Sequence, residues 1–121
     1  MTLGEKQRLF AKQVPRLIDK AHELGFEVTL GDAYRDPRSH GKLGEKGIYG
    51  AIYSCHKSRL AIDLNLFRDP DGDGPQPAQY QADTEAHRPL GEWWEAQHPD
   101  NCWGGRFEDG NHYSMTHEGM K

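Results

Sequence analysis

The chain has 121 residues, a length typical of a single domain of roughly 100–150 residues. Its formal net charge of −4 at pH 7 argues against a broad nucleic-acid-binding face, because such faces are normally basic. No apolar run approaches the roughly 20 residues that a membrane-spanning helix needs. We therefore expect one domain over residues 1–121, a monomer that neither binds nucleic acid nor inserts into a membrane.

A helix is predicted at the start of the chain. Thr2 and Glu5 have the spacing of a capping box, and apolar residues follow at helical intervals as far as Leu24. Pro15 lies inside this pattern, so we expect the helix to kink or restart there. Gly25 is a suitable stop.

The middle of the chain predicts strands separated by loops. Alternation over residues 26–30 indicates a strand, and a short strand is expected over 51–55. Residues 60–67 are typical of a buried strand, and the segment between 31 and 50 is predicted as a long loop.

The last third predicts one helix and several short strands. Thr84 is the expected cap of a helix that runs to about residue 98, with Pro89 inside it. Short strands are expected between residues 102 and 117. The fold class is therefore predicted to be α+β, with helices flanking a small antiparallel sheet.

Three residues have the chemistry of a catalytic zinc site. His56, Asp63 and His112 offer two imidazoles and one carboxylate, which can bind zinc and leave one position open. His56 and Asp63 are seven residues apart, so on one continuous strand they would face opposite sides. We therefore expect the chain to turn over residues 57–59. Asp109 lies three residues before His112.

Two motifs and a dipeptide carry a resemblance to a known family. The first motif is Ser54, His56, Ala61 and Asp63, and the second is Trp103, Gly104, Gly105, Phe107, Asp109 and His112. Tyr34 and Arg35 follow the first predicted strand. In this order the residues resemble the zinc D-Ala-D-Ala carboxypeptidase and L-Ala-D-Glu endopeptidase family, which includes VanY-like enzymes and phage endolysins. The resemblance covers residues 26–113.

The resemblance implies a role for each residue. His56, Asp63 and His112 would bind one zinc ion, which lowers the pKa of water toward about 7. Asp109 would take the proton of the attacking water and pass it to the leaving amine. Arg35 would stabilise the charge that develops on the carbonyl oxygen. The implied fold is that of D-Ala-D-Ala metallopeptidases and the hedgehog signalling domain.

The sequence departs from the family at two positions. Many relatives have glycine where this chain has Arg59, so a side chain there would narrow the site or change the turn. Relatives often have an acidic or amide residue where this chain has Ser114, which leaves the support of His112 in question. Glu108 is an alternative to Asp109 as the base, and an ion pair with Asp32 or Asp36 is the alternative role for Arg35.

Other side chains have weaker functional signals. Ser54, Trp103 and Arg59 are candidates for the surroundings of the metal or the cleft, with strand end and core as the alternatives for Ser54 and Trp103. Trp93 and Trp94 are adjacent, so one of them could line the cleft. Cys55 and Cys102 are expected to be free thiols. The remaining histidines, His22, His40, His87, His98 and His117, are expected at the surface.

An acidic run suggests a possible second metal. Asp69, Asp71 and Asp73, followed by Gly74, resemble the start of a calcium-binding loop. The twelfth position of that loop is Tyr80 instead of glutamate, so the template is incomplete. Calcium binding and a solvated acidic turn both remain open.

The resemblance implies hydrolysis of peptidoglycan stem peptides, with cleavage of the L-Ala-D-Glu bond as the expected reaction. The alternatives are a D-Ala-D-Ala carboxypeptidase, with Arg38, Lys42 or Arg59 receiving the terminal carboxylate, and a non-catalytic zinc-containing module that binds the wall. Because no secretory signal is found at the N-terminus, we expect a phage-type endolysin. Such a protein is made in the host cytoplasm and acts on the cell wall after release.

Overall fold

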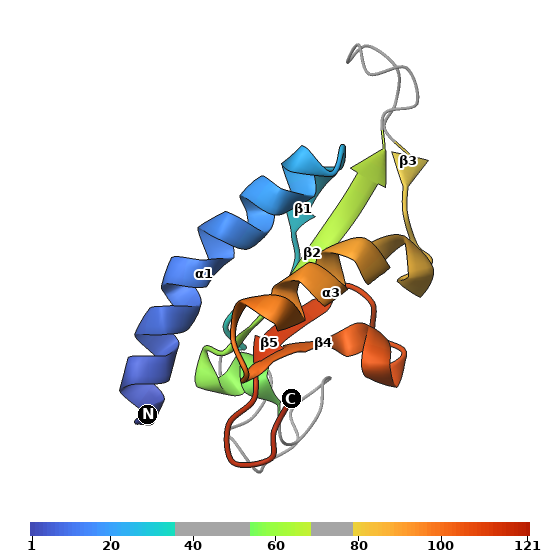
Figure 1. Cartoon of the computed structure of the whole chain (residues 1–121). Coiled ribbons are helices and arrows are strands. Elements are labelled where there is room, and N and C mark those ends of the chain that lie inside the picture. Colours follow the sequence, from blue (N-terminus) through green and yellow to red (C-terminus); the bar gives the residue numbers. More distant parts are fainter. Residues whose placement is uncertain (36–53, 69–78) are drawn as a thin grey trace.

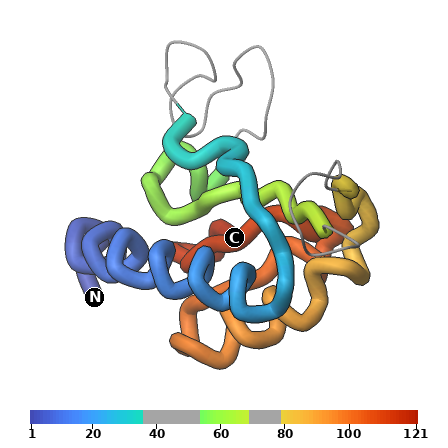
Figure 2. The backbone as a smooth tube through the Cα atoms, turned by 90° about the horizontal axis from the view of Figure 1, so that it is seen from above, coloured from blue at the N-terminus to red at the C-terminus, as the bar shows by residue number. Residues whose placement is uncertain are grey.

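The computed structural model describes residues 1–35, 54–68 and 79–121, and shows two helices packed on one face of an antiparallel sheet (Figures 1 and 2). The sheet has five strands in the order β1-β2-β5-β4, with β3 also paired to β2. The elements are α1 (Leu3–Glu23), β1 (Glu27–Leu30), η1 (Cys55–Ser58), β2 (Ala61–Arg68), β3 (Gln79–Tyr80), η2 (Thr84–His87), α3 (Arg88–Gln97), β4 (Asn101–Trp103), η3 (Gly104–Phe107) and β5 (His112–Met115). The predicted α+β class is confirmed.

Helix α1 begins as predicted and does not restart at Pro15. Thr2 and Glu5 form a reciprocal capping box, and Gly25 follows the helix with a φ of 92°. Pro15 cannot donate a hydrogen bond to the carbonyl of Ala11, but both residues lie on the exposed side of the helix. Water can satisfy that carbonyl, so the expectation of a restart was wrong.

The strands predicted over 26–30 and 60–67 correspond to β1 and β2. The strand expected over 51–55 is wrong at its end, because Cys55 begins the 3₁₀ turn η1. Ser54 causes this change by accepting a hydrogen bond from the backbone N–H of His56 at 3.2 Å. Residues 51–53 lie outside the described residues.

The predicted C-terminal helix and strands are present, with a different cap. Asp83, not Thr84, caps the turn η2 by accepting a hydrogen bond from the N–H of Glu85 at 3.1 Å. Helix α3 then starts at Arg88, and Pro89 lies in its first turn, where a missing N–H costs little.

Alternation along β2 separates the core from the other face of the sheet. Ile62 pairs with Tyr113 and both side chains are buried in the core, whereas Asp63 pairs with His112 on the opposite face. The two helices lie over the core face (Figure 1), and the alternation of side chains leaves the Asp63–His112 pair on the other face of the sheet. The sheet therefore positions two predicted metal ligands side by side.

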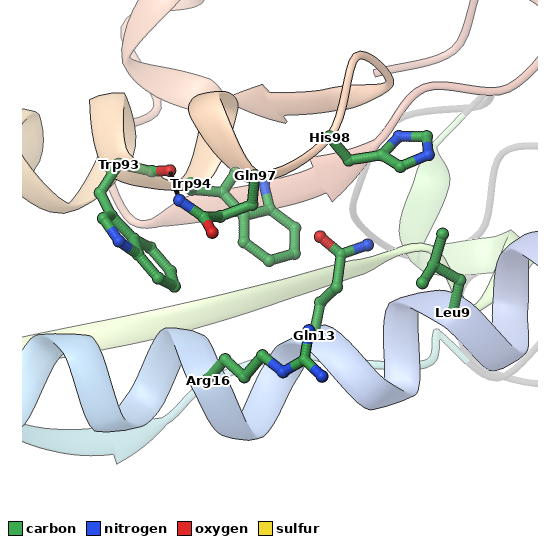
Figure 3. A pocket seen from close by; sticks show the side chains of 7 residues that line it. All are labelled: Leu9, Gln13, Arg16, Trp93, Trp94, Gln97 and His98. Atoms are coloured by element: carbon green, nitrogen blue, oxygen red, sulfur yellow. Dashed lines mark hydrogen bonds between the residues drawn. The ribbon is translucent and has the colours of Figure 1, made fainter.

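The tryptophans lie mainly in the core. Trp94 and Trp103 are fully buried, and a Cβ added at Gly91 or at Gly105 would overlap the indole of Trp103. Trp93 is half-buried and lines a cavity of about 90 Å³ between α1 and α3 (Figure 3). This cavity shares no residue with the predicted metal site, so Trp93 and Trp94 do not line that site.

Two further expectations concern thiols and membranes. Cys55 and Cys102 are both free and buried, as predicted. Among the described residues, no helix has the length and apolar character needed to span a bilayer.

Candidate metal centre

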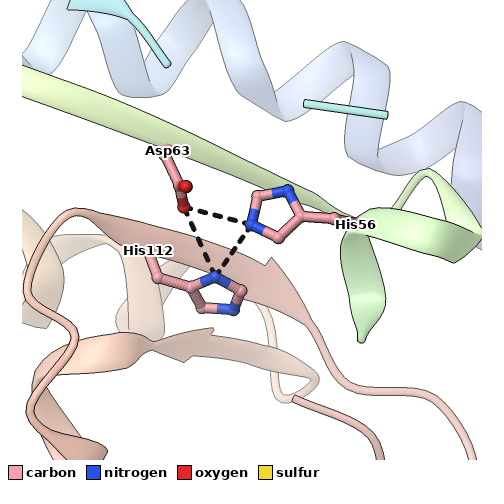
Figure 4. Close-up of side chains that lie close together, drawn as sticks. All are labelled: His56, Asp63 and His112. Atoms are coloured by element: carbon pink, nitrogen blue, oxygen red, sulfur yellow. Dashed lines mark hydrogen bonds and ion pairs between the residues drawn. The ribbon is translucent and has the colours of Figure 1, made fainter. Parts of the chain in front are cut away.

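Three side chains from separate elements converge at the predicted site (Figure 4). His56 comes from η1, Asp63 from β2 and His112 from the first position of β5. The His56 Nε2 atom lies 3.1 Å from Asp63 Oδ1 and 3.2 Å from His112 Nδ1. The Nδ1 atom of His112 lies 3.5 Å from the same carboxylate oxygen. The predicted convergence of these three residues is confirmed.

The turn between His56 and Asp63 explains how their side chains meet, although the two residues are an odd number of positions apart. Residues Cys55–Ser58 form the 3₁₀ turn, and Arg59 ends it in a left-handed conformation with a φ of 57°. Glycine adopts that conformation without steric cost, so the backbone of this turn is one that a glycine at position 59 would favour. Arg59 holds the same turn, and its guanidinium lies 4.1 Å from the ring centre of Tyr34.

A backbone contact fixes the proton on the His56 ring. The Nδ1 atom lies 2.8 Å from the carbonyl oxygen of Ala33, which can only accept, so Nδ1 carries the proton. In the neutral ring, Nε2 then presents a lone pair to the Asp63 carboxylate, which is also an acceptor. Two acceptors at 3.1 Å repel unless a proton or a cation lies between them.

The spacing of the three atoms suits a small divalent cation. A tetrahedral zinc ion with bonds of about 2.0–2.1 Å separates neighbouring ligand atoms by about 3.3 Å. The observed separations of 3.1, 3.2 and 3.5 Å bracket this value. The donor set and its spacing therefore fit a metal ion, and the identity of that ion is not fixed by three such ligands.

The charge of Asp63 also favours a cation. Burial alone raises the pKa of this carboxyl, but hydrogen bonds from His112, and from His56 when both of its ring nitrogens carry a proton, outweigh burial and lower the pKa to about 2. The group is therefore ionised at any pH near neutrality and supplies the negative charge of the cluster.

The segment 31–35 holds the His56 and Asp63 side of the centre. Gly31 donates its N–H to the carbonyl of Asp63 at 2.8 Å, and Asp63 donates its own N–H to the carbonyl of Asp32 at 2.7 Å. Arg35 donates its N–H to the carbonyl of His56 at 3.1 Å. Backbone bonds thus tie this segment to both ligands.

Arg35 lies beside the metal ligands and is mostly buried. Its Nε lies 3.4 Å from Asp32 Oδ2, and its Nη1 lies 3.4 Å from the hydroxyl of Ser54. The ion pair with Asp32 is therefore formed, and it holds the guanidinium next to the turn that carries His56. Ser54 links Arg35 to that turn, because its hydroxyl also accepts from the His56 N–H.

Asp109 is the carboxylate next to the three ligands. Its Oδ2 lies 3.9 Å from His112 Nδ1, and its side chain is 52% exposed. The preceding residue, Glu108, has a φ of 62° and ends the turn η3, so the backbone turns between Glu108 and Asp109 instead of running extended. Among the described residues, Asp109 and not Glu108 approaches the three ligands.

Gly104 allows the Asp109 turn to lie against His112. A Cβ at this position would overlap the carbonyl of Asp109 and would lie 2.6 Å from the Cβ of His112. Asp109 closes the turn by donating its N–H to the carbonyl of Gly104 at 2.8 Å. The first glycine after Trp103 is thus required by close packing at the site.

The other candidate residues lie in different places. Trp103 belongs to the core, and Cys55 faces away from the ligands with its Sγ 3.4 Å from the carbonyl of Met115. Burial raises the pKa of the Cys55 thiol to about 12, so it is a poor ligand. The calcium candidates Asp69, Asp71 and Asp73 lie outside the described residues, as do Arg38, Lys42 and His40.

His87 is a buried residue that the sequence interpretation placed at the surface. It is 2% exposed, and its Nδ1 lies 2.8 Å from the hydroxyl of Tyr113, the neighbour of His112. Burial lowers the pKa of His87 to about 4, although a backbone hydrogen bond at Gln81 opposes this. The spacing of His87, Leu90 and Trp94 is that of one helix face, which is the signal that would have found it.

The other described histidines were also expected at the surface. His22 is exposed, whereas His98 and His117 are half-buried.

Comparisons with known proteins give no relative: no family model matches the chain, and no curated protein matches it. The geometry of the site and the order of its motifs therefore carry the functional argument.

Proposed function

We propose that the protein is a zinc metallopeptidase that hydrolyses peptidoglycan stem peptides, as an L-alanyl-D-glutamate endopeptidase of the phage endolysin type. The observation that carries the proposal is the convergence of two imidazoles and one carboxylate, with one half-exposed carboxylate beside them. A closed structural zinc site usually has four protein ligands. Three ligands with an acid next to them suit hydrolysis.

The motif order supports the choice of substrate. The two motifs around His56 and His112, together with Tyr34 and Arg35, resemble those of peptidases that act on cell-wall peptides. The α+β fold, with its small antiparallel sheet, is compatible with the hedgehog and D-Ala-D-Ala metallopeptidase fold, which we propose for this chain. We also propose that the protein is made in the host cytoplasm and acts on the wall after release.

The residues divide the chemistry between them. His56, Asp63 and His112 would hold the zinc ion, which when bound acts as a Lewis acid and lowers the pKa of water toward about 7. Asp109 lies close enough to accept the proton of the attacking water and is exposed enough to deliver it to the leaving amine. Arg35, which contacts Asp32 and Ser54, would stabilise the charge on the carbonyl oxygen.

The test is mass spectrometry of purified peptidoglycan fragments after digestion by the zinc-loaded protein. Asp109→Asn should lower the rate by about 10²–10⁴-fold, because it removes a general base and keeps the shape of the side chain. Glu108→Gln is the matched control and should cleave at the wild-type rate. A chelated sample should be inactive.

The products decide between the related activities. Peptides that begin with D-Glu support the endopeptidase, whereas release of free D-Ala would assign a carboxypeptidase to the same centre. If the zinc-loaded protein cut no bond in any wall type, the peptidase proposal would be wrong, and a zinc-containing module that binds the wall would replace it.

A further inference from the structure

The two histidines of the metal centre differ in what lies behind them. His56 Nδ1 donates its proton to the carbonyl of Ala33 at 2.8 Å, and the ring is 1% exposed. His112 turns its Nδ1 toward the other ligands, and its Nε2 is buried without a hydrogen-bond partner in the described part of the chain. One ligand is anchored on both nitrogens and the other on one.

This difference affects metal binding because a ligating imidazole normally donates its second N–H to a carbonyl, a carboxylate or water. Such a partner fixes the orientation of the ring and makes it a stronger ligand. Loss of a partner of this kind typically lowers metal affinity by about 10–100-fold. When His112 binds metal through Nδ1, its Nε2 carries the proton, and no acceptor for that proton lies among residues 1–35, 54–68 and 79–121.

The register of the sheet identifies the position from which a partner could come. Asp63 pairs with His112 and Ala61 pairs with Ser114, so the side chains of residues 112 and 114 lie on the same face of β5. Ser114 is fully buried, and its hydroxyl donates to the carbonyl of Cys102 at 3.5 Å. It is short and directed to β4, so it does not support His112.

We infer that position 114 sets how tightly the centre holds its metal, and that serine there leaves His112 as the weakly held ligand. His112 would then be the first ligand to let go of a bound metal, while His56 and Asp63 would stay in place because segment 31–35 holds both of them. The occupancy of the centre, and with it the activity, follows the free zinc concentration. This inference rests on the proposed zinc centre and adds regulation by metal supply.

The direct test measures zinc affinity by competition with a chromophoric chelator, in the absence of any substrate. Ser114→Gln places an amide oxygen on the face of His112 and should tighten zinc binding by about 10-fold or more. Ser114→Ala, the matched control, should bind zinc as the wild type does, because the hydroxyl does not contact His112. An unchanged affinity in folded Ser114→Gln, or a large loss in Ser114→Ala, would overturn the inference.

Because residue 114 is fully buried, a second measurement on the wild-type chain guards against a variant that does not fold. In the zinc-loaded protein, nitrogen-15 NMR can observe the ring N–H of each histidine ligand. The His56 proton should exchange slowly with water because Ala33 binds it, and the His112 proton should exchange at least about 10-fold faster. Equal protection of the two protons would show that His112 has a partner and would overturn the inference.

These readouts are independent of peptide cleavage. If zinc binds as described and no wall peptide is cut, the proposed function fails and the asymmetry of the centre stands. If wall peptides are cut and the two histidines prove equally supported, the proposed function stands and the asymmetry of the centre is wrong.

Discussion

Segment 31–35 and the turn from Gly104 to Asp109 flank the same three side chains, and they support them by different means. The first segment makes backbone hydrogen bonds to Asp63 and His56 and receives the ring proton of His56. The second reaches His112 by close packing through Gly104 and one backbone bond from the His112 N–H to the carbonyl of Asp109 at 3.1 Å. Hydrogen bonds thus hold one side, and steric fit holds the other.

This contrast shows where each side is vulnerable. Backbone hydrogen bonds depend little on side-chain identity, so the His56 side should keep its structure when side chains of its supporting segment are exchanged, except at Gly31, where an added Cβ would lie 3.0 Å from the Cβ of Asp63. A tightly packed contact, such as the one at Gly104, is disrupted when a side-chain atom is added to it. The predictions below test this contrast, from the largest expected effect to the smallest.

Gly104→Ala should have the largest effect. Its Cβ would overlap the carbonyl of Asp109 and crowd His112, so the turn η3 must move. We expect unfolding free energy to fall by about 3 kcal/mol and zinc binding to weaken strongly. Urea unfolding and chelator competition measure both effects.

Gly119→Ala is the control for that substitution. Gly119 has a φ of 82°, and an added Cβ there meets nothing within 4 Å, so only the backbone cost of about 1 kcal/mol should appear. Equal losses in the two variants would show that close packing at Gly104 is not what holds the His112 side.

The second prediction concerns the core face of β5, where His87 contacts Tyr113. Burial lowers the pKa of His87 to about 4, below the value of about 6.5 for an unfolded chain. The unfolded state therefore binds the proton first, so this stability is complete above pH 6.5 and is lost as pH falls toward 4. We expect a loss of about 2–3 kcal/mol at pH 4.5 relative to pH 7.

Urea unfolding of the metal-free protein at the two pH values measures this loss, with His87→Asn as the comparison. The variant should be less stable than the wild type at pH 7, and the gap should narrow at pH 4.5. A gap that stays constant with pH would show that His87 does not titrate in this way.

The third prediction compares His56→Phe with His112→Phe in the metal-free protein. The first removes the hydrogen bond to Ala33 and leaves a carbonyl without its donor, which should cost about 1–3 kcal/mol. The second removes the hydrogen bond from His112 to Asp63, but it also removes a buried Nε2 that has no partner in the described structure, so its loss of stability should be the smaller of the two. Thermal unfolding distinguishes the two, and a larger loss for His112→Phe would reverse the contrast between the sides.

The smallest effect is expected for Arg59→Gly. Glycine relieves the left-handed backbone at a φ of 57°, which favours the variant by about 1 kcal/mol. The change also removes the contact between Arg59 and Tyr34, worth about 0.5–1 kcal/mol at an exposed site. The free energies of unfolding from urea titrations should differ by less than about 0.5 kcal/mol between the variant and the wild type. A clear loss of stability in the variant would show that Arg59 supports the His56 turn.

Much of the fold could be predicted because local signals agree with it. The capping box at Thr2 and Glu5, the apolar period of α1 and the alternation of β2 each depend on neighbouring residues. The expected restart at Pro15 failed because exposure of Ala11 depends on which side of the helix faces the sheet. Which side of the helix faces the sheet depends on residues that are distant in the sequence.

The candidate site could also be predicted in part, because some of its features depend only on neighbouring residues. The turn between His56 and Asp63 follows from their odd spacing, and the structure contains it. His87 was missed although its spacing from Leu90 and Trp94 is a local signal of burial, and only its contact with Tyr113 involves a distant strand. Ser114 put the support of His112 in question, but the burial of the His112 Nε2 atom without a partner among the described residues could be seen only in the structure.

The glycines on either side of Trp103 have a consequence for how related chains can diverge. Gly91 comes from α3 and Gly105 from η3, and neither can gain a Cβ while the indole stays between them. A smaller ring at position 103 would release both positions at once. Among homologous chains, residues 91, 103 and 105 should therefore covary as a group, and exchange of one alone should be rare.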